Sequence, residues 1–216
     1  MLKLYGYWRS SAAYRVRIGL SLKNVAYEQE SINLAPSVMA HRSEAYKALN
    51  PQMRVPALET PDGIVSQSMA ILEWIEETYD SGAPLLPSTA IDRAKCRAFA
   101  DIIACDVHPL NNPSVLSVLR EEFGGESDQI SAWYAYWIQQ GFAALEILAE
   151  ERSGDFLFGS GPTLAEICLI PQIYNARRFK VDLGDFPNLL EIDRICLELN
   201  EFQAAIPENQ PDAIIK

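Results

Sequence analysis

The distribution of strand-like segments is the feature of this sequence that most restricts its fold. Short runs rich in aromatic and β-branched residues occur only before residue 81, and the rest of the chain carries apolar residues at helical spacing. Residues 81–88 are rich in Gly, Pro and Ser, as linkers are. We therefore predict a small α/β domain over residues 1–84 and an all-helical domain over residues 88–216.

The order of elements in the first region follows from local signals. Predicted strands lie at 3–8, 25–33, 55–59 and 63–65, and predicted helices at 10–23, 36–49 and 67–79. Beyond the linker, predicted helices lie at 91–123, 130–152, 164–179 and 187–202. Thr163 and Glu166 have the spacing of a capping box at the start of a buried helix. The first region is thus expected to have the order βαβ–α–ββα.

Charge and cysteine content narrow the classes of partner. The formal net charge is −11 and no Lys/Arg run occurs, which argues against nucleic acid or an anionic membrane as the main partner. No apolar stretch approaches the ~18 residues that span a bilayer. The four cysteines are far apart, without CxxC or metal-ligand spacing. We therefore expect free thiols in a reducing cytoplasm and no metal site.

The segment Arg9-Ser10-Ser11 precedes the first predicted helix. Its simplest role is a helix cap beside an exposed arginine. A helix N-terminus also presents unpaired N–H groups that stabilise an anion, and a thiol placed there has a lowered pKa. Because the chain has no cysteine at this position, such a thiol would belong to a ligand.

Two further dipeptides lie at strand and helix junctions of the same region. Val55-Pro56 opens a strand, where proline commonly occupies an edge; a cis proline would instead turn the backbone of Val55 toward a peptide-like ligand. Gln67-Ser68 begins a helix and either caps it or binds a carboxylate. Three such segments in one small domain indicate a ligand site.

Residues 8–18, Trp-Arg-Ser-Ser-Ala-Ala-Tyr-Arg-Val-Arg-Ile, resemble the signature of the zeta class of glutathione transferases. The resemblance extends over nearly the whole chain, through residues 50–51, 55–56, 67–71, 106–112, 170–172, 175–182 and 208–212. It implies a thioredoxin-like N-terminal domain, an all-α C-terminal domain, glutathione as cofactor and a cytoplasmic homodimer. One departure is Ala12, where the family often has cysteine; any chemistry of a protein thiol is thereby lost.

The resemblance also implies an activity, the glutathione-dependent conversion of maleylacetoacetate to fumarylacetoacetate in tyrosine and phenylalanine catabolism. The alternatives are isomerisation of maleylpyruvate, or transfer and dehalogenation reactions of small electrophiles. Pro113-Ser114 stands where the family's maleylpyruvate isomerases have an additional arginine, which favours maleylacetoacetate. A binding module without activity is a third possibility, against which the intact serine motif argues.

Roles for individual residues follow from the same resemblance. Ser10 would donate to the thiolate, supported by Ser11 and the amides near Ala12, with Tyr7 as the rival donor. The γ-glutamyl carboxylate would bind Gln67 and Ser68, and the cysteinyl part would pair with the backbone of Val55. The remaining candidate cofactor contacts are His41, His108, Asn112 and Arg15, of which Arg15 has charge pairing as its simpler role. Arg9 and Arg178 would bind the carboxylates of a small anionic substrate.

Overall fold

The computed structural model describes residues 1–214, which divide into two compact units. One comprises Met1–Leu85 together with the segment from Glu198, and the other comprises Leu86–Leu197. The boundary falls inside the expected linker. The C-terminal segment differs from the expectation that it belongs with residues 88–197. It clusters with the first unit because helix α9 (Asn200–Ala205), with Phe202 fully buried, packs against α1.

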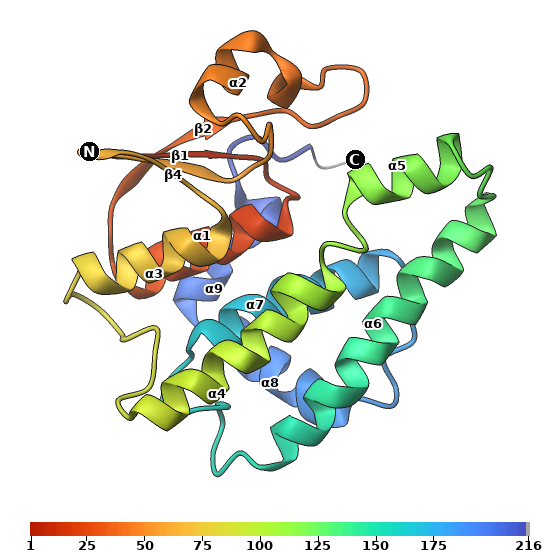
Figure 1. Ribbon diagram of the computed structural model, residues 1–216. Helices are drawn as coiled ribbons and strands as arrows, with labels where there is room; N and C mark the ends of the chain where they lie inside the picture. The colour runs from red at the N-terminus through yellow and green to blue at the C-terminus, as the bar shows by residue number, and fades with distance from the viewer. Residues whose placement is uncertain (215–216) are drawn as a thin grey trace. The chain divides into compact units, whose positions relative to one another are not determined.

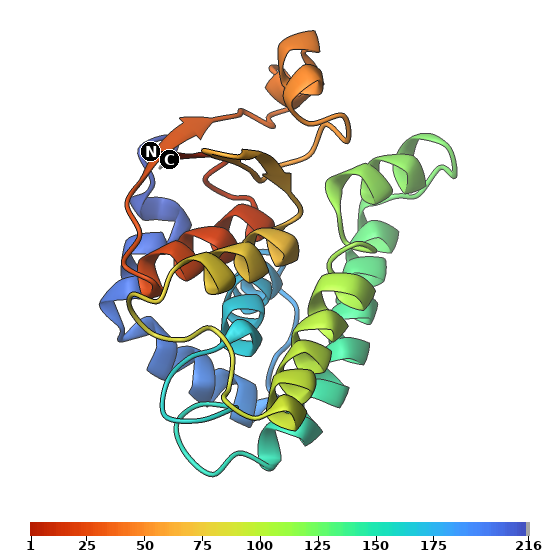
Figure 2. The same cartoon turned by 60° about the vertical axis from the view of Figure 1, so that its left-hand side comes forward.

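The first unit is a four-stranded sheet with helices on its faces. The strands are β1 (Leu2–Gly6), β2 (Tyr27–Ser31), β3 (Ala57–Thr60) and β4 (Gly63–Ser66). Their order is β2-β1-β3-β4, with β1 parallel to β2 and antiparallel to β3, and β3 antiparallel to β4. The helices are α1 (Ser11–Leu22), α2 (Glu44–Leu49) and α3 (Ser68–Thr78). Figures 1 and 2 show α1 and α3 side by side on one face of the sheet, with α2 on the other side. The predicted thioredoxin-like order is confirmed.

The close contact between α1 and α3 depends on Gly19. A Cβ atom at this position would lie 2.2 Å from a methyl carbon of Leu72 on α3. On either side of the glycine, Ile18 and Leu20 are completely buried, as is Leu72. Fully burying side chains of this size contributes about 1.5–3 kcal/mol each. The absence of a side chain at position 19 therefore lets the two helices that begin at the predicted ligand site pack directly on each other.

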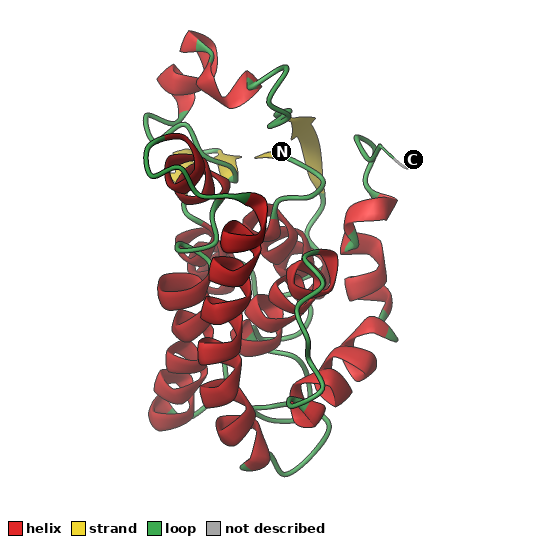
Figure 3. Ribbon diagram, turned by 90° about the vertical axis from the view of Figure 1, so that its right-hand side faces the viewer, coloured by secondary structure: helices red, strands yellow, loops and turns green. Residues whose placement is uncertain are grey.

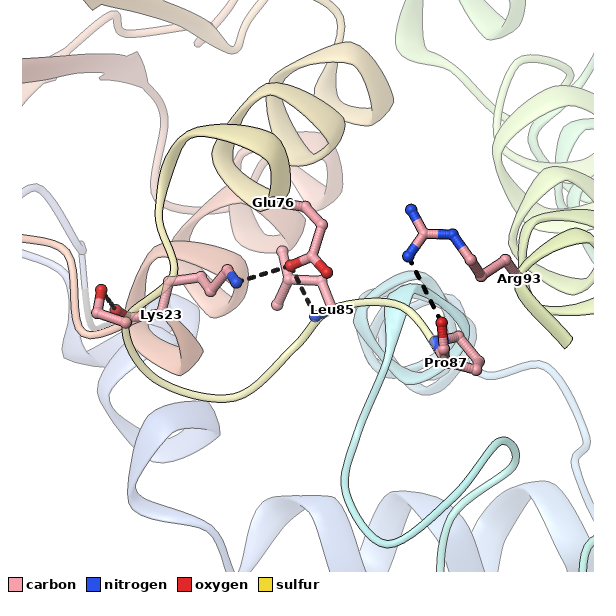
Figure 4. Close-up of polar contacts among 6 residues, drawn as sticks. Lys23, Glu76, Leu85, Pro87 and Arg93 are labelled. Carbon is pink, nitrogen blue, oxygen red and sulfur yellow. Dashed lines mark hydrogen bonds and ion pairs between the residues drawn. The ribbon is translucent and has the colours of Figure 1, made fainter. Parts of the chain in front are cut away.

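Charged side chains hold the linker on both sides of the boundary between Leu85 and Leu86, each within its own unit (Figure 4). In the first unit, Glu76 on α3 pairs with the Nζ of Lys23 at 2.8 Å and accepts the backbone N–H of Leu85 at 3.0 Å. Both charged side chains are largely buried, with 5% and 11% exposed. In the second unit, Arg93 donates to the carbonyl of Pro87 at 3.5 Å.

The second unit is helical, and all strands drawn in Figure 3 belong to the first unit. Its elements are α4 (Ala90–Asp101), the π-helical turn η2 (Ile102–Val107), α5 (Pro113–Glu121), α6 (Ser127–Glu150), α7 (Leu164–Arg178) and α8 (Pro187–Leu197). Among residues 1–214, no helix has the length and apolar character needed to cross a membrane.

Three predicted helices are shorter than expected. The helix predicted over 91–123 is interrupted at 108–112, because Asn112 caps a new helix whose first residue is Pro113. The one predicted over 187–202 is interrupted before Asn200, where α9 begins. The one predicted over 36–49 reduces to a 3₁₀ turn and α2, because the Ser43 side chain accepts the Tyr46 N–H and starts the helix there.

The predicted capping box at the start of α7 is confirmed. The backbone N–H and hydroxyl of Thr163 donate to Glu166 at 2.7 and 2.8 Å, and the Leu157 N–H donates to the other carboxylate oxygen at 2.6 Å. Glu166 is completely buried, and burial raises the pKa of its carboxyl group while these donors oppose the shift. The box therefore compensates a buried acidic group as well as capping a helix.

We expect Thr163→Val to lower the free energy of unfolding by about 1–2 kcal/mol, because the helix loses its cap and Glu166 loses a buried donor. Denaturant titration followed by circular dichroism measures this change. Thr89→Val, at the exposed cap of α4, is the matched control and should cost less. Equal losses in the two variants would contradict a special role for the buried box.

Candidate functional site

The register of the sheet brings the three segments predicted to bind a ligand to one end of the first unit. Tyr5 near the end of β1 pairs with Ala57 at the start of β3, and Ala57 pairs with Ser66 at the end of β4. The residues after β1, before β3 and after β4 therefore all lie at this end of the sheet. The segments containing Ser10, Val55-Pro56 and Gln67-Ser68 are the ones brought together.

Ser10 is the N-cap of α1. Its Oγ accepts the Ala13 N–H at 3.2 Å, which leaves the hydroxyl hydrogen able to donate to a ligand. No acidic residue lies in the first turn of α1, so no carboxylate offsets the partial positive charge of the helix N-terminus. Ser11 and Ala12 are half-buried beside it. A hydroxyl donor and helix amides here have the arrangement that stabilises a thiolate.

The residues before Ser10 form a turn in which the Ser10 N–H donates to the Tyr7 carbonyl at 2.9 Å. Tyr7 is only 6% exposed, and its ring meets the Trp8 ring edge to face. Arg9 is exposed, and its guanidinium lies over the Trp8 ring, 4.8 Å from the centroid. This cation–π contact fixes a positive charge next to Ser10.

A second group of anion-binding features lies at the start of α3. Gln67 occupies the N-cap position with a positive φ of 70° and donates from its side-chain amide to Gln52 at 2.6 Å. The hydroxyl of Ser68, the first helical residue, accepts from an Nη of Arg15 at 3.4 Å. The first turn of α3 contains no acidic residue. This helix end therefore also favours a negatively charged ligand group.

Arg15 is the residue that most strongly favours an anion at this helix end. Its side chain is 1% exposed, and its Nε and second Nη have no hydrogen-bond partner among residues 1–214. Buried guanidinium N–H groups without acceptors are costly, and a carboxylate has two oxygens that match their geometry. The sequence favoured a structural role in charge pairing for Arg15, on the first helix. The structure instead shows it reaching across to Ser68 at the start of α3.

The Val55–Pro56 peptide bond is cis, as expected. The carbonyl of Arg54, immediately before it, accepts both the Asn50 side-chain amide at 2.7 Å and the Tyr46 hydroxyl at 2.8 Å. These two bonds fix the loop that presents Val55. Sequence reasoning included Asn50 only through a family resemblance and did not identify Tyr46, whose ring gives no local sign of this role.

His41 lies after β2 in the 3₁₀ turn Ala40–Arg42. Burial and the neighbouring Arg42 both lower the pKa of its imidazole, which favours the neutral form of the ring. Its Nδ1 is buried and has no partner in the described part of the chain. No hydrogen bond within residues 1–214 joins His41 to the other candidate cofactor residues.

In the second unit, Tyr134 of α6 contacts Phe179, the residue after Arg178, and Asn111, the residue before Asn112. The Tyr134 ring stacks on the Phe179 ring with 3.8 Å between their centroids. The Arg178 guanidinium also lies over the Phe179 ring, 4.7 Å from its centroid. The Tyr134 carbonyl accepts the Asn111 side-chain amide at 3.1 Å. The end of α7 and the segment after the π-helical turn are thereby tied to the same residue. No local sequence feature distinguishes Tyr134 and Phe179 from ordinary core residues.

His108 and Asn112 lie in this segment after the π-helical turn, and both have structural roles. The His108 N–H donates to Ile103 at 2.8 Å and closes the turn. The Asn112 side-chain oxygen accepts the N–H and hydroxyl of Ser114 at 3.0 and 2.8 Å, as the cap of α5. A ligand contact by Asn112 would therefore use its amide nitrogen.

The thioredoxin-like unit and the helical unit that follows it in sequence each match a domain of one known family. Residues 1–77 match the glutathione S-transferase N-terminal domain, and residues 131–192 match the C-terminal domain. The maleylacetoacetate isomerase of Pseudomonas aeruginosa is 43% identical over 98% of both chains. The chain belongs to the glutathione S-transferase family.

Two solved structures refine this assignment. A maleyl pyruvate isomerase, described as a bacterial glutathione S-transferase in the zeta class, has a TM-score of 0.94 and 45% identity, over 98% of this chain and 100% of that one. The maleylacetoacetate isomerase of Methylobacterium extorquens AM1, with bound malonate and glutathione, has a TM-score of 0.93 and 36% identity, over 99% and 100% of the two chains. The resemblance to the zeta class is confirmed.

Proposed function

We propose that this protein is a glutathione-dependent isomerase that converts the cis double bond of maleylacetoacetate into the trans double bond of fumarylacetoacetate. The observation that carries the proposal is the cap of α1, where Ser10 offers a hydroxyl donor at a helix end that has no carboxylate in its first turn. The family supplies glutathione as the thiol, and the relatives named above act on maleyl compounds.

The reaction is nucleophilic catalysis with a thiol borrowed from glutathione. The thiolate adds to one alkene carbon, and the electron pair of the double bond moves onto the conjugated carbonyl as an enolate. The former double bond is now single and rotates. Collapse of the enolate expels the thiolate and restores the alkene in the trans form, so no net oxidation or proton change occurs. Ser10 stabilises the thiolate before addition and after elimination, with Ser11 and the amides near Ala12 in support.

Glutathione would be held by the groups at the same end of the sheet. Its γ-glutamyl carboxylate fits the start of α3, where Gln67, Ser68 and the unpaired N–H groups of Arg15 provide donors. The backbone of Val55 would pair with the cysteinyl part of the peptide. His41 would contact the glycyl end through its neutral ring. From the second unit we assign His108 and Asn112 as further cofactor contacts.

The substrate is a dianion, whereas the chain carries a net charge of −11. Capture must therefore depend on local cations, because exposed charges farther away than about 10 Å are screened by salt. We assign this role to Arg9, fixed on Trp8, and to Arg178, fixed on Phe179. Guanidinium groups suit carboxylate and enolate oxygens because they donate two parallel hydrogen bonds.

The choice between maleylacetoacetate and maleylpyruvate rests on the residues after Asn112. Identities of 45% to a maleyl pyruvate isomerase and 43% to a maleylacetoacetate isomerase do not separate the two substrates. Pro113 at the first position of α5 leaves no cation there. Maleylpyruvate, with a carboxylate on its keto carbon, would lack the partner that the family's maleylpyruvate isomerases provide.

We expect kcat/KM to be at least about tenfold higher for maleylacetone than for maleylpyruvate. A ratio of this size corresponds to the free energy of roughly one charge-assisted hydrogen bond in the transition state. Pro113→Arg should reduce this ratio by improving turnover of maleylpyruvate, while Pro113→Ala, which adds no charge, should not. Spectrophotometric assays of both substrates with the three proteins measure the ratios. A wild-type preference for maleylpyruvate would make that compound the substrate. Retention on immobilised glutathione without turnover of either substrate would indicate a binding module.

We further infer a homodimer in the cytoplasm that acts in tyrosine and phenylalanine catabolism. A dimer interface would be expected to cover exposed apolar side chains such as Ile91 on α4, which is 64% exposed, and Ile147 on α6, which is 65% exposed. All four cysteines are free thiols, as expected in a reducing compartment.

A further inference from the structure

The C-terminal segment reaches back to the turn that carries Ser10. After α9, Gln210 is 8% exposed and donates from its side chain to the carbonyls of Ala204 and Ile206 at 3.0 and 2.8 Å. These bonds fold the tail back on itself, so that Asp212 follows an ordered segment. Both Figure 1 and Figure 2 show this blue segment beside α1 and the sheet.

The Asp212 carboxylate accepts three hydrogen bonds from two different parts of the first unit. One oxygen accepts the Trp8 backbone N–H at 3.1 Å and the Ser31 hydroxyl at 2.7 Å, and the other accepts the Gln29 side-chain amide at 3.1 Å. Ser31 and Gln29 belong to β2, and Trp8 belongs to the turn after β1. The carboxylate thus joins the turn to the neighbouring parallel strand.

The other side of the Trp8 residue is held as well. Arg17 of α1 is 1% exposed and donates from an Nη to the Trp8 carbonyl at 3.1 Å. Its Nε donates to the Ala205 carbonyl, at the end of α9, at 3.0 Å. The Asp212 carboxylate on the Trp8 N–H and the Arg17 guanidinium on the Trp8 carbonyl therefore fix the backbone of Trp8. The C-terminal segment supplies Asp212 itself and the Ala205 carbonyl that accepts from Arg17.

The position of Trp8 matters because the two residues that follow it, Arg9 and Ser10, carry the proposed reactive groups. Its ring supports the Arg9 guanidinium, and Ser10 follows two residues later in a turn closed by the Tyr7 carbonyl. A shift of the Trp8 backbone would move the Ser10 hydroxyl relative to a bound thiolate. Misplacement of a catalytic group by about 1 Å can lower a rate substantially.

We infer that Asp212 is a positioning residue of the thiol site: its carboxylate holds the Trp8 peptide so that Ser10 and Arg9 meet the sulfur and the substrate. This inference rests on the proposed function for Ser10. It places a C-terminal residue, distant in sequence, among the determinants of thiol activation. Asp212 touches no reacting atom and acts only through Trp8.

The test compares Asp212→Ala and Asp212→Asn with Gln210→Ala, in the full-length protein. Gln210→Ala removes bonds that fold the tail without removing an acceptor from Trp8, and is therefore the matched control. Three quantities are measured for each protein: the pKa of the bound glutathione thiol from thiolate absorbance, kcat and KM with maleylacetone, and the melting temperature.

We expect Asp212→Ala to lower kcat about three- to tenfold and to raise the pKa of the bound thiol, because a donor group misplaced by a lost hydrogen bond stabilises the thiolate less. KM for glutathione should stay within about twofold, because the γ-glutamyl site at α3 is untouched. Asp212→Asn should change kcat and the thiol pKa less than Asp212→Ala does, since the amide oxygen of asparagine still accepts the Trp8 N–H. Gln210→Ala should lower the melting temperature without changing the thiol pKa.

An unchanged thiol pKa in Asp212→Ala would overturn the inference and leave Asp212 as a residue that only anchors the tail. The titration needs only glutathione. If the wild-type protein binds glutathione but does not isomerise maleylacetone, the proposed function fails while the titration still decides the role of Asp212.

Discussion

Replacement of Ser10 by alanine is expected to lower kcat about 10²–10³-fold, the range found when one donor to a reacting anion is removed. The same change should raise the pKa of the bound glutathione thiol, because the thiolate loses its hydroxyl donor. At pH 7 less of the thiol is then ionised, so activity should recover partly as the pH rises through the raised pKa. Thiolate absorbance and kcat, both measured against pH, test this expectation.

The controls separate thiol activation from helix capping. Ser10→Gly removes the hydroxyl at little cost to the cap, so it should lose as much activity as Ser10→Ala. Ser10→Thr keeps a hydroxyl at the same position and should restore part of the rate. Tyr7→Phe should have little effect, because Tyr7 is buried against Trp8. A larger loss in Tyr7→Phe than in Ser10→Ala would transfer the role of donor to Tyr7.

Replacement of Arg178 by methionine is expected to reduce kcat/KM for maleylacetoacetate about ten- to a hundredfold, equivalent to roughly 1.5–3 kcal/mol for a charge-assisted hydrogen bond. Conjugation of an uncharged electrophile should fall much less, because no carboxylate is involved. Arg178→Lys should recover only part of the loss, since an ammonium group does not reproduce the paired donors of a guanidinium. Steady-state kinetics with both substrates measures these differences.

A neighbouring residue provides the control for net charge. Lys180 is exposed and lies two residues after Arg178, so Lys180→Met makes the same change in net charge near the end of α7. It should leave kcat/KM for the dianion almost unchanged, because surface charges act weakly at a distance. Equal losses on neutral and dianionic substrates in Arg178→Met would show that Arg178 supports the fold or the cofactor and not the substrate.

Local sequence signals determined much of this protein. The order of strands and helices in the first unit, the caps at Ser10 and Thr163, and the segments at Val55-Pro56 and Gln67-Ser68 all depend on residues a few positions apart. The prediction of one continuous helix over residues 91–123 was wrong at Asn112-Pro113, although a cap followed by proline at the first helical position is itself a local signal. Such features are accessible because propensity and capping act within one helical turn.

The tertiary structure alone decided which distant residues meet. Arg15 donates to Ser68, and Asp212 accepts the Trp8 N–H. Tyr134 contacts both Phe179 and Asn111. Trp8 and Asp212 are 204 positions apart, so their contact leaves no periodic or capping pattern in either segment. Helix formation is governed by neighbours along the chain, whereas the contact of Asp212 with Trp8 depends on sheet register and on the packing of α9 against α1. The contacts of Tyr134 depend on the packing of helices in the second unit. The sequence therefore located the groups that carry the chemistry, and the fold determined what holds them in place.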